Sequence, residues 1–485
     1  MAIPFGGDRI TRVSEALAAA FRPGDRLIVV QETGDLLHVP ADVHALAAAA
    51  VGQAVEAFGA LQQASKEQVS DFFEQFAARL EADEGWAPIA KANEFDVAKA
   101  KEHGRSTTRL AATAKMRAEM IDGLRRWRDA PAGERLVEKV DHEEWAVEQV
   151  TAPLGVVAFV FEGRPNVFAD AAGVIRGGNT VVFRIGSDAL GTARAIAEHA
   201  LKPALYAAGL PARAAVLVES AERAAGWAMF SDHRVALAVA RGSGGAVAQL
   251  GAVARQAGVP VSLHGTGGAW MIAVDDADET RFRASVLNSL DRKVCNTLNV
   301  CCLVGGQRLL TPFLEALKEA GERGGHGCKL HIVSGYEWLP KAWIDATTRV
   351  RRAEGDQDEP LVERLEEAAL GREWEWEATP EVTLVIVREI EEALALFNRY
   401  SPQFILSVIA NQQATHDYVW ANANAGFVGD GMTRWVDGQY AFNRPELGLS
   451  NWEHGRLLAR GGVLSGDSVF TIRTRMRQKD IGLHR

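Results

Sequence analysis

The sequence predicts an α/β protein with two lobes, each built on a parallel sheet that helices cover on both faces. Three observations support this fold class. From residue 151 onward, short apolar runs alternate with amphipathic stretches in cycles of roughly 20 to 35 residues, which is the pattern of βαβ units. The apolar runs are continuous and rich in Val, Ile and Phe, as strands buried on both faces require. A second series of such runs begins at residue 269, so we expect two sheets.

The first lobe opens with helices. The first 150 residues carry mostly helical spacing, for example at 43–58 and at 66–80, after a strand-like run at 25–32. The strands of the first sheet are then predicted at 156–161, 180–184, 214–218, 235–240 and 260–263. Helices between these strands are expected to begin near Ala189, Ala221 and Ala246.

The second lobe is predicted from the runs at 269–274, 298–304, 382–387 and 404–409, with a helix at 280–290. The acidic stretch at 354–377 is expected to be a solvated surface insertion. We place the domain boundary near residue 264, and no long linker separates the lobes. The predicted plan is an N-terminal extension (1–44), a first lobe (45–263) with a hairpin near 140–150, a second lobe (264–440), and a return to the first lobe with a terminal strand (441–485).

Composition excludes several classes of protein. With 485 residues, 47% of them hydrophobic and 24% charged, the chain has the make-up of a globular protein of roughly two to three domains. Its net charge of -10 has the wrong sign for binding nucleic acid through an overall field. The four cysteines form neither a disulfide framework nor zinc pairs, and the twelve histidines lack the spacing of metal ligands. Without a signal peptide or an uncharged apolar span of 18 residues, we expect a cytoplasmic protein that binds neither a membrane nor a metal.

Cys295 is the candidate nucleophile. It follows the cations Arg292 and Lys293, and nearby positive charge stabilises the thiolate that attacks a carbonyl carbon. Cys301 and Cys302 lie within an apolar run and are predicted to be buried strand residues. From local context alone, Cys295 fits either a nucleophile or an inert thiol.

A thiol hydrolase would need further partners for Cys295. His264 and Asn166 are available for such a triad, but the local signatures of thiol proteases are absent. The sequence therefore disfavours a hydrolase.

Glycine-bearing turns follow three of the predicted strands, at 184–187, 241–245 and 264–268. Glycine lets backbone amides approach phosphate oxygens, and Arg at two of the strand ends can pair with phosphate. None of the turns fits the dinucleotide fingerprint or the P-loop, so each is also compatible with an ordinary tight turn. Arg164 and Asn166 follow the strand at 156–161, at the edge where α/β sheets bind ligands.

In order and spacing, these segments resemble the aldehyde dehydrogenase superfamily, and within it the gamma-glutamyl phosphate reductase branch, over residues 45–475. The resemblance is carried by PLGVV at 153–157, FEGRPNV at 161–167, GNTVVFR at 178–184, GSDA at 186–189, VPV at 259–261 with His264, the stretch 288–296, NRY at 398–400, MTRW at 432–435 and PELGLS at 445–450. It implies that the first lobe binds the cofactor and that the second lobe is catalytic.

The resemblance also implies roles for individual residues. Cys295 matches the nucleophile, and the Asn166 amide with the Cys295 backbone N–H would form the oxyanion hole. Residues Arg164, Asn296 and Arg434 are expected to bind substrate. The expected cofactor residues are Arg184, Gly186 and Ser187 at the adenosine ribose, Arg241, Gly242 and Gly244 at the pyrophosphate, and Glu446 at the nicotinamide ribose. Arg184 would favour a 2′-phosphate and hence NADPH.

A missing carboxylate indicates the type of reaction. Oxidising members of the superfamily carry a Glu general base where this chain has His264-Gly265-Thr266-Gly267-Gly268. Without that base, a thioester is expected to accept hydride or exchange with phosphate rather than be hydrolysed. The resemblance thus implies NADPH-dependent reduction of an acyl phosphate to an aldehyde, with L-glutamyl 5-phosphate as the default substrate and proline biosynthesis as the setting.

Departures from the branch leave alternatives open. The stretch before Cys295 is short and lacks a Gln-Arg-Pro-Gly segment, and an apolar run at 404–406 replaces polar donors. These changes are compatible with another acyl phosphate, with an acyl-CoA reductase, or with an inactive relative that serves as a binding protein or scaffold. The resemblance further implies a homo-dimer or tetramer, assembled through the runs at 145–150 and 469–473, and an upstream kinase that supplies the acyl phosphate.

Overall fold

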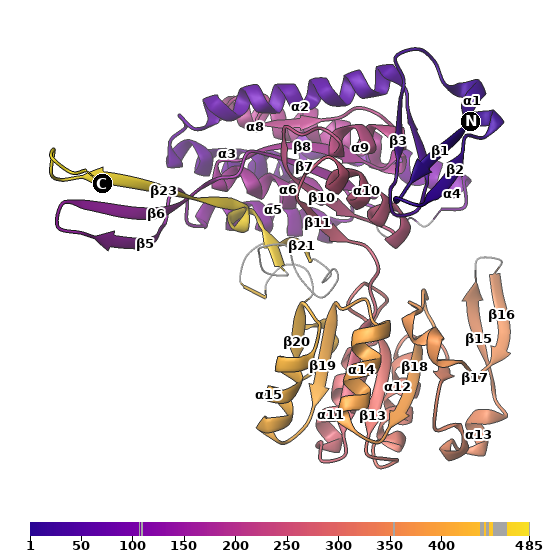
Figure 1. The fold of residues 1–485 in the computed structure, drawn as a ribbon. Coiled ribbons are helices and arrows are strands. Elements are labelled where there is room, and N and C mark those ends of the chain that lie inside the picture. Colours follow the sequence, from indigo (N-terminus) through magenta and orange to yellow (C-terminus); the bar gives the residue numbers. More distant parts are fainter. Residues whose placement is uncertain are drawn as a thin grey trace. The chain divides into compact units, whose positions relative to one another are not determined.

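Two units make up the chain in the computed structural model, which describes residues 1–105, 107, 110–352, 355–436, 441–442, 446–449 and 463–484 (Figure 1). Unit 1 contains Met1–Gly265, Phe442–Leu449 and Val463–Arg485, and unit 2 contains Thr266–Ala441 and Ser450–Gly462. The first segment of unit 1 therefore ends at Gly265, directly after His264. The sequence predicts this boundary near residue 264.

A five-stranded parallel sheet forms the centre of unit 1. Its strand order is β11-β10-β7-β8-β9. The strands are β7 (Val156–Phe161), β8 (Thr180–Ile185), β9 (Ala215–Leu217), β10 (Val235–Arg241) and β11 (Val261–His264). Each predicted strand is present with its ends within one residue, so the α/β fold class is confirmed.

Helices cover both faces of this sheet. Alternate residues of β7 point to opposite sides: Val157 and Phe159 pack with α3 to α8, and Val156 and Ala158 pack with α2, α9 and α10. The helices are α2 (Ala41–Leu61), α3 (Lys66–Glu81), α4 (Asp83–Glu102), α5 (Ala114–Asp129), α6 (Val167–Ala172), α7 (Leu190–Ile196), α8 (Lys202–Ala207), α9 (Arg223–Phe230) and α10 (Gly244–Gln256). By length and composition α2 could cross a membrane, but its buried residues Ala47, Val51 and Ala54 belong to the sheet's core.

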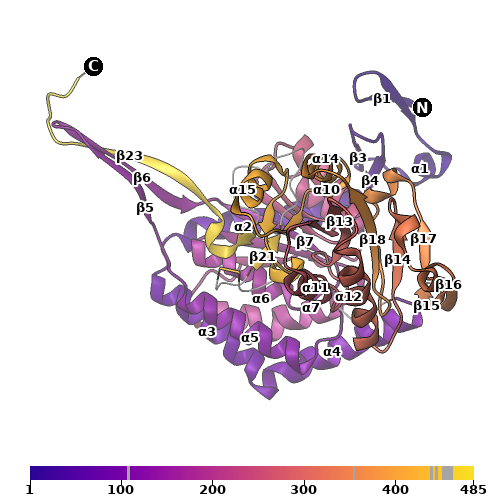
Figure 2. The same cartoon turned by 90° about the horizontal axis from the view of Figure 1, so that it is seen from below.

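Small sheets flank the core of unit 1. The N-terminal extension folds as two hairpins around α1 (Glu15–Ala20): β1 (Ala2–Phe5) with β2 (Arg9–Arg12), and β3 (Arg26–Val29) with β4 (Leu36–Val39). A three-stranded antiparallel sheet joins β5 (Leu136–Asp141), β6 (Trp145–Pro153) and the C-terminal β23 (Phe470–Gln478). This narrow sheet extends away from the helices of unit 1 in both views (Figures 1 and 2).

A seven-stranded parallel sheet forms unit 2, in the order β17-β14-β18-β13-β12-β19-β20. The strands are β12 (Ala269–Val274), β13 (Leu298–Val304), β14 (Lys329–Ile332), β17 (Val362–Arg364), β18 (Glu381–Val387), β19 (Ile405–Ile409) and β20 (Phe427–Gly429). One face packs against α11 (Glu279–Asn288) and α12 (Leu310–Arg323), and the other against α14 (Ile390–Tyr400) and α15 (Gln413–Asn422).

The acidic stretch at 354–377 is only partly a solvated surface, so that prediction is wrong in part. β16 (Gly355–Pro360) pairs with β15 (Thr347–Arg352), and β17 joins the edge of the main sheet. Trp374 and Trp376 are buried in the core of unit 2. The high acidic content of this stretch wrongly indicated full exposure, because apolar residues next to the acidic ones are buried in the core.

Candidate active site

The carboxyl ends of β7 and β10 lie side by side in unit 1, where the direction of strand succession reverses. From β7 the chain adds β8 and β9 on one side, then crosses to add β10 and β11 on the other. Arg241 at the end of β10 pairs in register with Phe161 at the end of β7. Such a switch point is where open α/β sheets bind their ligands. The turns predicted to bind the cofactor and substrate therefore start from adjacent strands.

Arg164 and Asn166 lie in the turn between β7 and α6. Both side chains are half-buried. The Asn166 Nδ2 donates to Asp170 Oδ2 at 3.2 Å, which fixes the orientation of the amide from within its own helix. An amide NH₂ has two donors, so Asn166 retains one for the oxyanion role that remains a prediction.

Arg184, Gly186 and Ser187 lie at the end of β8 and in the turn after it. Arg184 is buried, donates to the Ala221 carbonyl at 3.1 Å, and has an Nε without a hydrogen-bond partner. Burial, with a smaller effect from the nearby Arg223, lowers the pKa of the Arg184 guanidinium. Two close cations and an unsatisfied buried donor fit an anionic ligand such as a 2′-phosphate. The sequence analysis missed Arg223, an exposed residue at the start of α9.

The turn predicted to line the pyrophosphate holds a carboxylate from the neighbouring strand end. Gly242 and Gly244 flank Ser243 at the start of α10, and the Ser243 N–H donates to Glu162 Oε1 at 2.6 Å. A methyl group on Gly242 would lie 2.6 Å from that oxygen, so the carboxylate packs directly on the turn. Glu162 thus occupies one of the backbone donors that a phosphate would use.

Cys295 lies in a loop between α11 and β13 that internal hydrogen bonds hold in shape. The Thr297 Oγ1 donates to the Arg292 carbonyl at 2.7 Å and accepts the Val294 N–H at 2.9 Å. The Gly268 N–H donates to the Cys295 carbonyl at 2.8 Å. Cys295 itself is half-buried, and the turn that follows His264 packs against it.

The other cysteines are unsuited to nucleophilic chemistry. All four cysteines are free thiols, and Cys301, Cys302 and Cys328 are buried. Burial raises the pKa of the Cys301 and Cys302 thiols and raises that of Cys328 to about 12. The prediction that Cys301 and Cys302 are buried strand residues is confirmed, because both lie within β13. Cys295 is therefore the accessible thiol of the chain.

Asn296 and Arg434, predicted to bind substrate, tie a second segment to the Cys295 loop. The Asn296 side chain is buried and donates to the Val436 carbonyl at 2.7 Å. Arg434 is also buried and lies 2.5 Å from Asp291 Oδ1, while the Thr433 Oγ1 donates to the Asn296 carbonyl at 2.7 Å. These contacts favour a role in holding the loop, and substrate contact by either residue stays a prediction.

Lys293 is an ion-pair partner and not an isolated positive charge beside the thiol. Its Nζ lies 2.5 Å from Glu373 Oε1. Of the two cations predicted to stabilise the Cys295 thiolate, Lys293 is therefore compensated by a carboxylate. Glu373 belongs to the stretch at 354–377 that was predicted to be a solvated surface. It is 80 residues from Lys293 along the chain, so no sequence motif indicates that the two residues pair.

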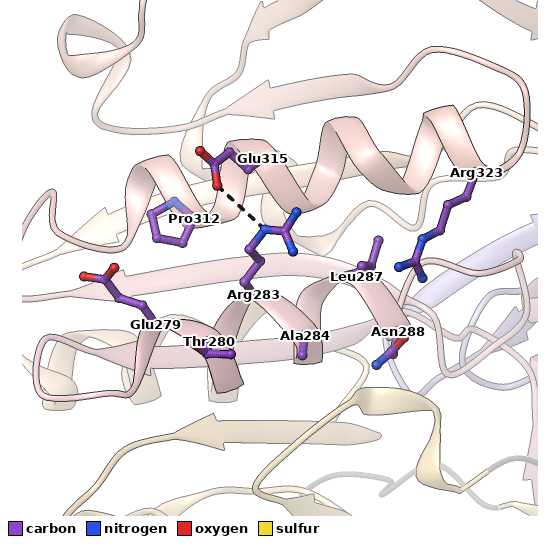
Figure 3. Close-up of a pocket in the computed structure, with 9 residues that line it drawn as sticks. All are labelled: Glu279, Thr280, Arg283, Ala284, Leu287, Asn288, Pro312, Glu315 and Arg323. Atoms are coloured by element: carbon purple, nitrogen blue, oxygen red, sulfur yellow. Dashed lines mark ion pairs between the residues drawn. The ribbon is translucent and has the colours of Figure 1, made fainter.

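Glu446, a metal site and the cavity of unit 2 remain to be placed relative to the predicted site residues. The side chain of Glu446, in β21 (Glu446–Leu449), lies outside the described residues. Among the residues that the structure describes, no group of three or more His, Cys, Asp and Glu is arranged to hold a metal ion. A cavity of about 490 Å³ between α11 and α12 is lined by none of the predicted site residues, and Arg283 on its wall forms an ion pair with Glu315 (Figure 3). Its cations Arg283 and Arg323 also both pair with Glu319.

The aldehyde dehydrogenase family model matches residues 31–319, which is more than half of the chain. This chain belongs to the aldehyde dehydrogenase family. It is 36% identical over 296 residues to a gamma-glutamyl phosphate reductase of Nitrobacter winogradskyi, a match that covers 58% of this chain and 68% of the relative. It is 30% identical over 396 residues to the gamma-glutamyl phosphate reductase of Novosphingobium aromaticivorans, covering 80% and 85%.

Solved structures share the fold of this chain. The gamma-glutamyl phosphate reductase of Thermotoga maritima superposes with a TM-score of 0.76 at 21% identity, covering 90% of this chain and all of that one. A propionaldehyde dehydrogenase of Rhodopseudomonas palustris with bound propionyl-CoA gives 0.62 at 13% identity, covering 89% and 94%. The chain is thus an oxidoreductase of a family that uses nicotinamide cofactors, and the resemblance to the gamma-glutamyl phosphate reductase branch is confirmed.

Proposed function

We propose that this aldehyde dehydrogenase family member is an NADPH-dependent acyl phosphate reductase that converts L-glutamyl 5-phosphate into glutamate-5-semialdehyde. The observation that carries the proposal is the accessible Cys295 in a rigid loop, in a chain whose relatives are gamma-glutamyl phosphate reductases. The turn packed against it supplies no carboxylate of its own at 264–268. A thioester on Cys295 is then directed to reduction and not to hydrolysis.

The reaction balances with the groups proposed. The Cys295 thiolate attacks the acyl carbon, the bond from that carbon to the phosphate oxygen breaks, and inorganic phosphate leaves. The Asn166 amide and the Cys295 N–H stabilise the oxyanion of each tetrahedral intermediate. The thioester carbon would then be reduced by hydride, which is the chemistry that NADPH would supply when bound to unit 1. Collapse of the reduced tetrahedral oxyanion then expels the Cys295 thiolate and yields the aldehyde without a further proton. The one proton that the reaction consumes goes to the departing phosphate, which is released as hydrogen phosphate.

Residues of unit 1 fit the cofactor. Arg184 and Arg223 would bind the 2′-phosphate of NADPH, because the buried Nε of Arg184 lacks a partner and Arg223 is exposed beside it. Gly186 and Ser187 would lie against the adenosine ribose. Arg241, Gly242 and Gly244 would line the pyrophosphate, and Glu162 would have to release the Ser243 N–H for phosphate to use that donor.

The reverse reaction tests the proposal. Purified protein is given glutamate-5-semialdehyde, NADP⁺ and inorganic phosphate, and NADPH formation is followed by its absorbance. We expect phosphate-dependent NADPH formation that Cys295→Ser abolishes and Cys328→Ser, at a buried thiol, preserves. NADPH that forms with CoA and not with phosphate would refute the proposal in favour of an acyl-CoA reductase. No NADPH with any acceptor, from a folded protein that binds no nicotinamide, would favour an inactive scaffold.

We also infer that the protein is a cytoplasmic homo-oligomer that assembles through the sheet of β5, β6 and β23. Apolar side chains on this sheet are exposed in the single chain, including Leu136, Val140, Ile472 and Met476. Burial against a second copy would remove them from water. Light scattering is expected to give a dimer or tetramer, and a monomer at micromolar concentration would refute this assembly.

A further inference from the structure

A carboxylate from a distant segment lies beside the Cys295 loop. The Glu373 Oε2 accepts the Gly267 N–H at 2.7 Å, and its Oε1 lies 2.5 Å from Lys293 Nζ. The Lys293 side chain is 8% exposed and the Glu373 side chain 17% exposed, so water screens this pair poorly. Each charge is therefore strongly felt by groups nearby.

The backbone on both sides of Glu373 is fixed to β13. The Asn299 Nδ2 donates to the Arg372 carbonyl at 2.8 Å, and the Asn299 Oδ1 accepts the Trp374 N–H at 2.9 Å. The buried Trp374 also donates from Nε1 to Thr383 Oγ1 at 2.7 Å. One strand residue, four positions after Cys295, thus holds the carboxylate in place.

Gly267 brings the carboxylate and the nucleophile together. A methyl group on Gly267 would lie 2.6 Å from the Cys295 Cα and 2.8 Å from Glu373 Oε1. The main chain of Cys295 and the Glu373 carboxylate therefore pack against the same glycine. Lys293, two residues before Cys295 in the same loop, pairs with the Glu373 carboxylate.

The other charged groups around the loop are screened by solvent or engaged elsewhere, and Arg292, three residues before Cys295, is exposed. Glu375 lies 3.7 Å from Lys293 Nζ but is 76% exposed, so solvent screens it. Asp291 and Arg434 are paired with each other. The Arg372 guanidinium lies over the Trp374 ring, 4.4 Å from its centroid.

We propose that Glu373 is a positioning residue that compensates the charge of Lys293 beside the nucleophile and thereby sets the reactivity of the Cys295 thiol. The inference rests on the proposed function only for the role of Cys295 as nucleophile. Removal of the carboxylate leaves a cation next to Cys295 and favours the thiolate. Removal of the cation leaves an anion there and favours the neutral thiol.

The two opposite shifts distinguish charge tuning from a structural role. Glu373→Gln keeps an oxygen acceptor for the Gly267 N–H and removes only the charge. Lys293→Met keeps the length of the side chain. Because both charges are poorly screened and pack against the loop that carries Cys295, each variant is expected to change the thiolate fraction at a given pH about tenfold, in opposite directions.

The experiment measures the rate of Cys295 alkylation by iodoacetamide against pH in the full chain, with peptide mass spectrometry to separate Cys295 from the other thiols. The midpoint pH is expected to fall by about one unit in Glu373→Gln and to rise by about one unit in Lys293→Met. The double variant is expected to return close to the wild-type midpoint, and the matched control Glu375→Gln to stay there. A variant that unfolds is recognised because its buried Cys301 becomes alkylated. In that case the midpoint pH of the double variant tests the inference, and a midpoint far from the wild-type value would contradict it.

Shifts of the two single variants in the same direction, or no shift in either, would overturn the inference. Because alkylation needs no substrate, its outcome is independent of the acyl phosphate assay. Opposite shifts in a protein that reduces no acyl phosphate would sink the proposed function and leave the charge pair standing. If the protein reduces the acyl phosphate, Cys295→Ser abolishes that reduction, and neither charge variant shifts the midpoint, the proposed function would be supported and the role of the charge pair refuted.

Discussion

Replacing Arg352 by Met is expected to destabilise unit 2 selectively. The Arg352 guanidinium joins two carboxylates: its Nε and Nη2 lie 2.7 and 2.8 Å from the Glu359 oxygens, and its Nη1 lies 2.7 Å from Glu381 Oε1. Glu381 is fully buried in β18 and is otherwise bonded to His331 Nε2 at 3.0 Å. Lys329 also pairs with Glu359. Without Arg352, a buried carboxylate loses its main compensating charge.

The magnitude follows from the carboxylates. The hydrogen bond from Arg352, followed by that from Lys329, lowers the pKa of Glu359 from its ordinary value to about 2. Burial acts to raise the pKa of Glu381, but the hydrogen bonds from His331 and Arg352 outweigh it and lower that pKa as well. At about 1.4 kcal/mol per pKa unit, the Glu359 shift from 4.5 to about 2 alone corresponds to about 3.5 kcal/mol. Because Lys329 retains part of this interaction, we expect a loss of about 2 to 3 kcal/mol.

Hydrogen exchange of the β14 and β18 amides measures the loss, since two units need not unfold in one step. The matched control is Arg351→Met on the same strand. Arg351 is 59% exposed and lies 2.8 Å from Asp356, and such a pair contributes under about 1 kcal/mol. Equal destabilisation by the two substitutions would refute the reasoning.

The same network predicts a pH dependence. The folded pKa values of Glu359 and Glu381 are depressed, so their contribution to stability is fully present above the unfolded value and is lost as the pH falls towards about 2. The difference between wild type and Arg352→Met should therefore be constant near neutral pH and fall to about half by roughly pH 3. A difference that does not change with pH would show that lost packing, not lost charge, causes the effect.

Three further predictions concern the site. Gly267→Ala places a methyl group 2.5 Å from the Cys295 carbonyl oxygen and should lower the rate of reduction at least about tenfold, measured as kcat with saturating substrate. Arg223→Ala should raise KM for NADPH about tenfold and leave KM for NADH unchanged, because only the 2′-phosphate loses a charge-assisted hydrogen bond. Glu162→Gln should tighten NADPH binding a few-fold by calorimetry, because it removes a negative charge from the Ser243 N–H at the start of α10.

The fold was predictable because its strongest signals are local. Continuous apolar runs such as 156–161 and 298–304 became strands with unchanged ends, since parallel strands are buried on both faces. The region at 354–377 was not predictable from its composition. Trp374 and Trp376 there enter the core because β17 and β18 bring the segment to the sheet, and that arrangement depends on pairing between distant residues.

The position of the candidate site residues in the fold was predictable where a motif places them within one turn, and their roles stay predictions. Asn166, Gly186, Gly242 and Cys295 lie in turns or loops, and Gly244 is the first residue of α10, as their motifs indicate. Arg223 and Glu162 were not identified, because their relation to the turns predicted to bind the cofactor comes from neighbouring strands and not from spacing. The packing of Asn296 and Arg434 against the loop likewise depends on contacts 140 or more residues apart.

Glu373 shows that a carboxylate missing from a turn in the sequence can be supplied to that turn by a distant segment. The turn at 264–268 has no carboxylate, yet the structure brings one to Gly267 from more than 100 residues away. A general base needs a free oxygen to take a proton from water. One Glu373 oxygen accepts the Gly267 N–H and the other faces Lys293, so both oxygens are already engaged by the protein. The carboxylate is therefore suited to tuning the thiol and poorly suited to activating water, so its presence does not restore the hydrolytic chemistry that the sequence of the turn argues against.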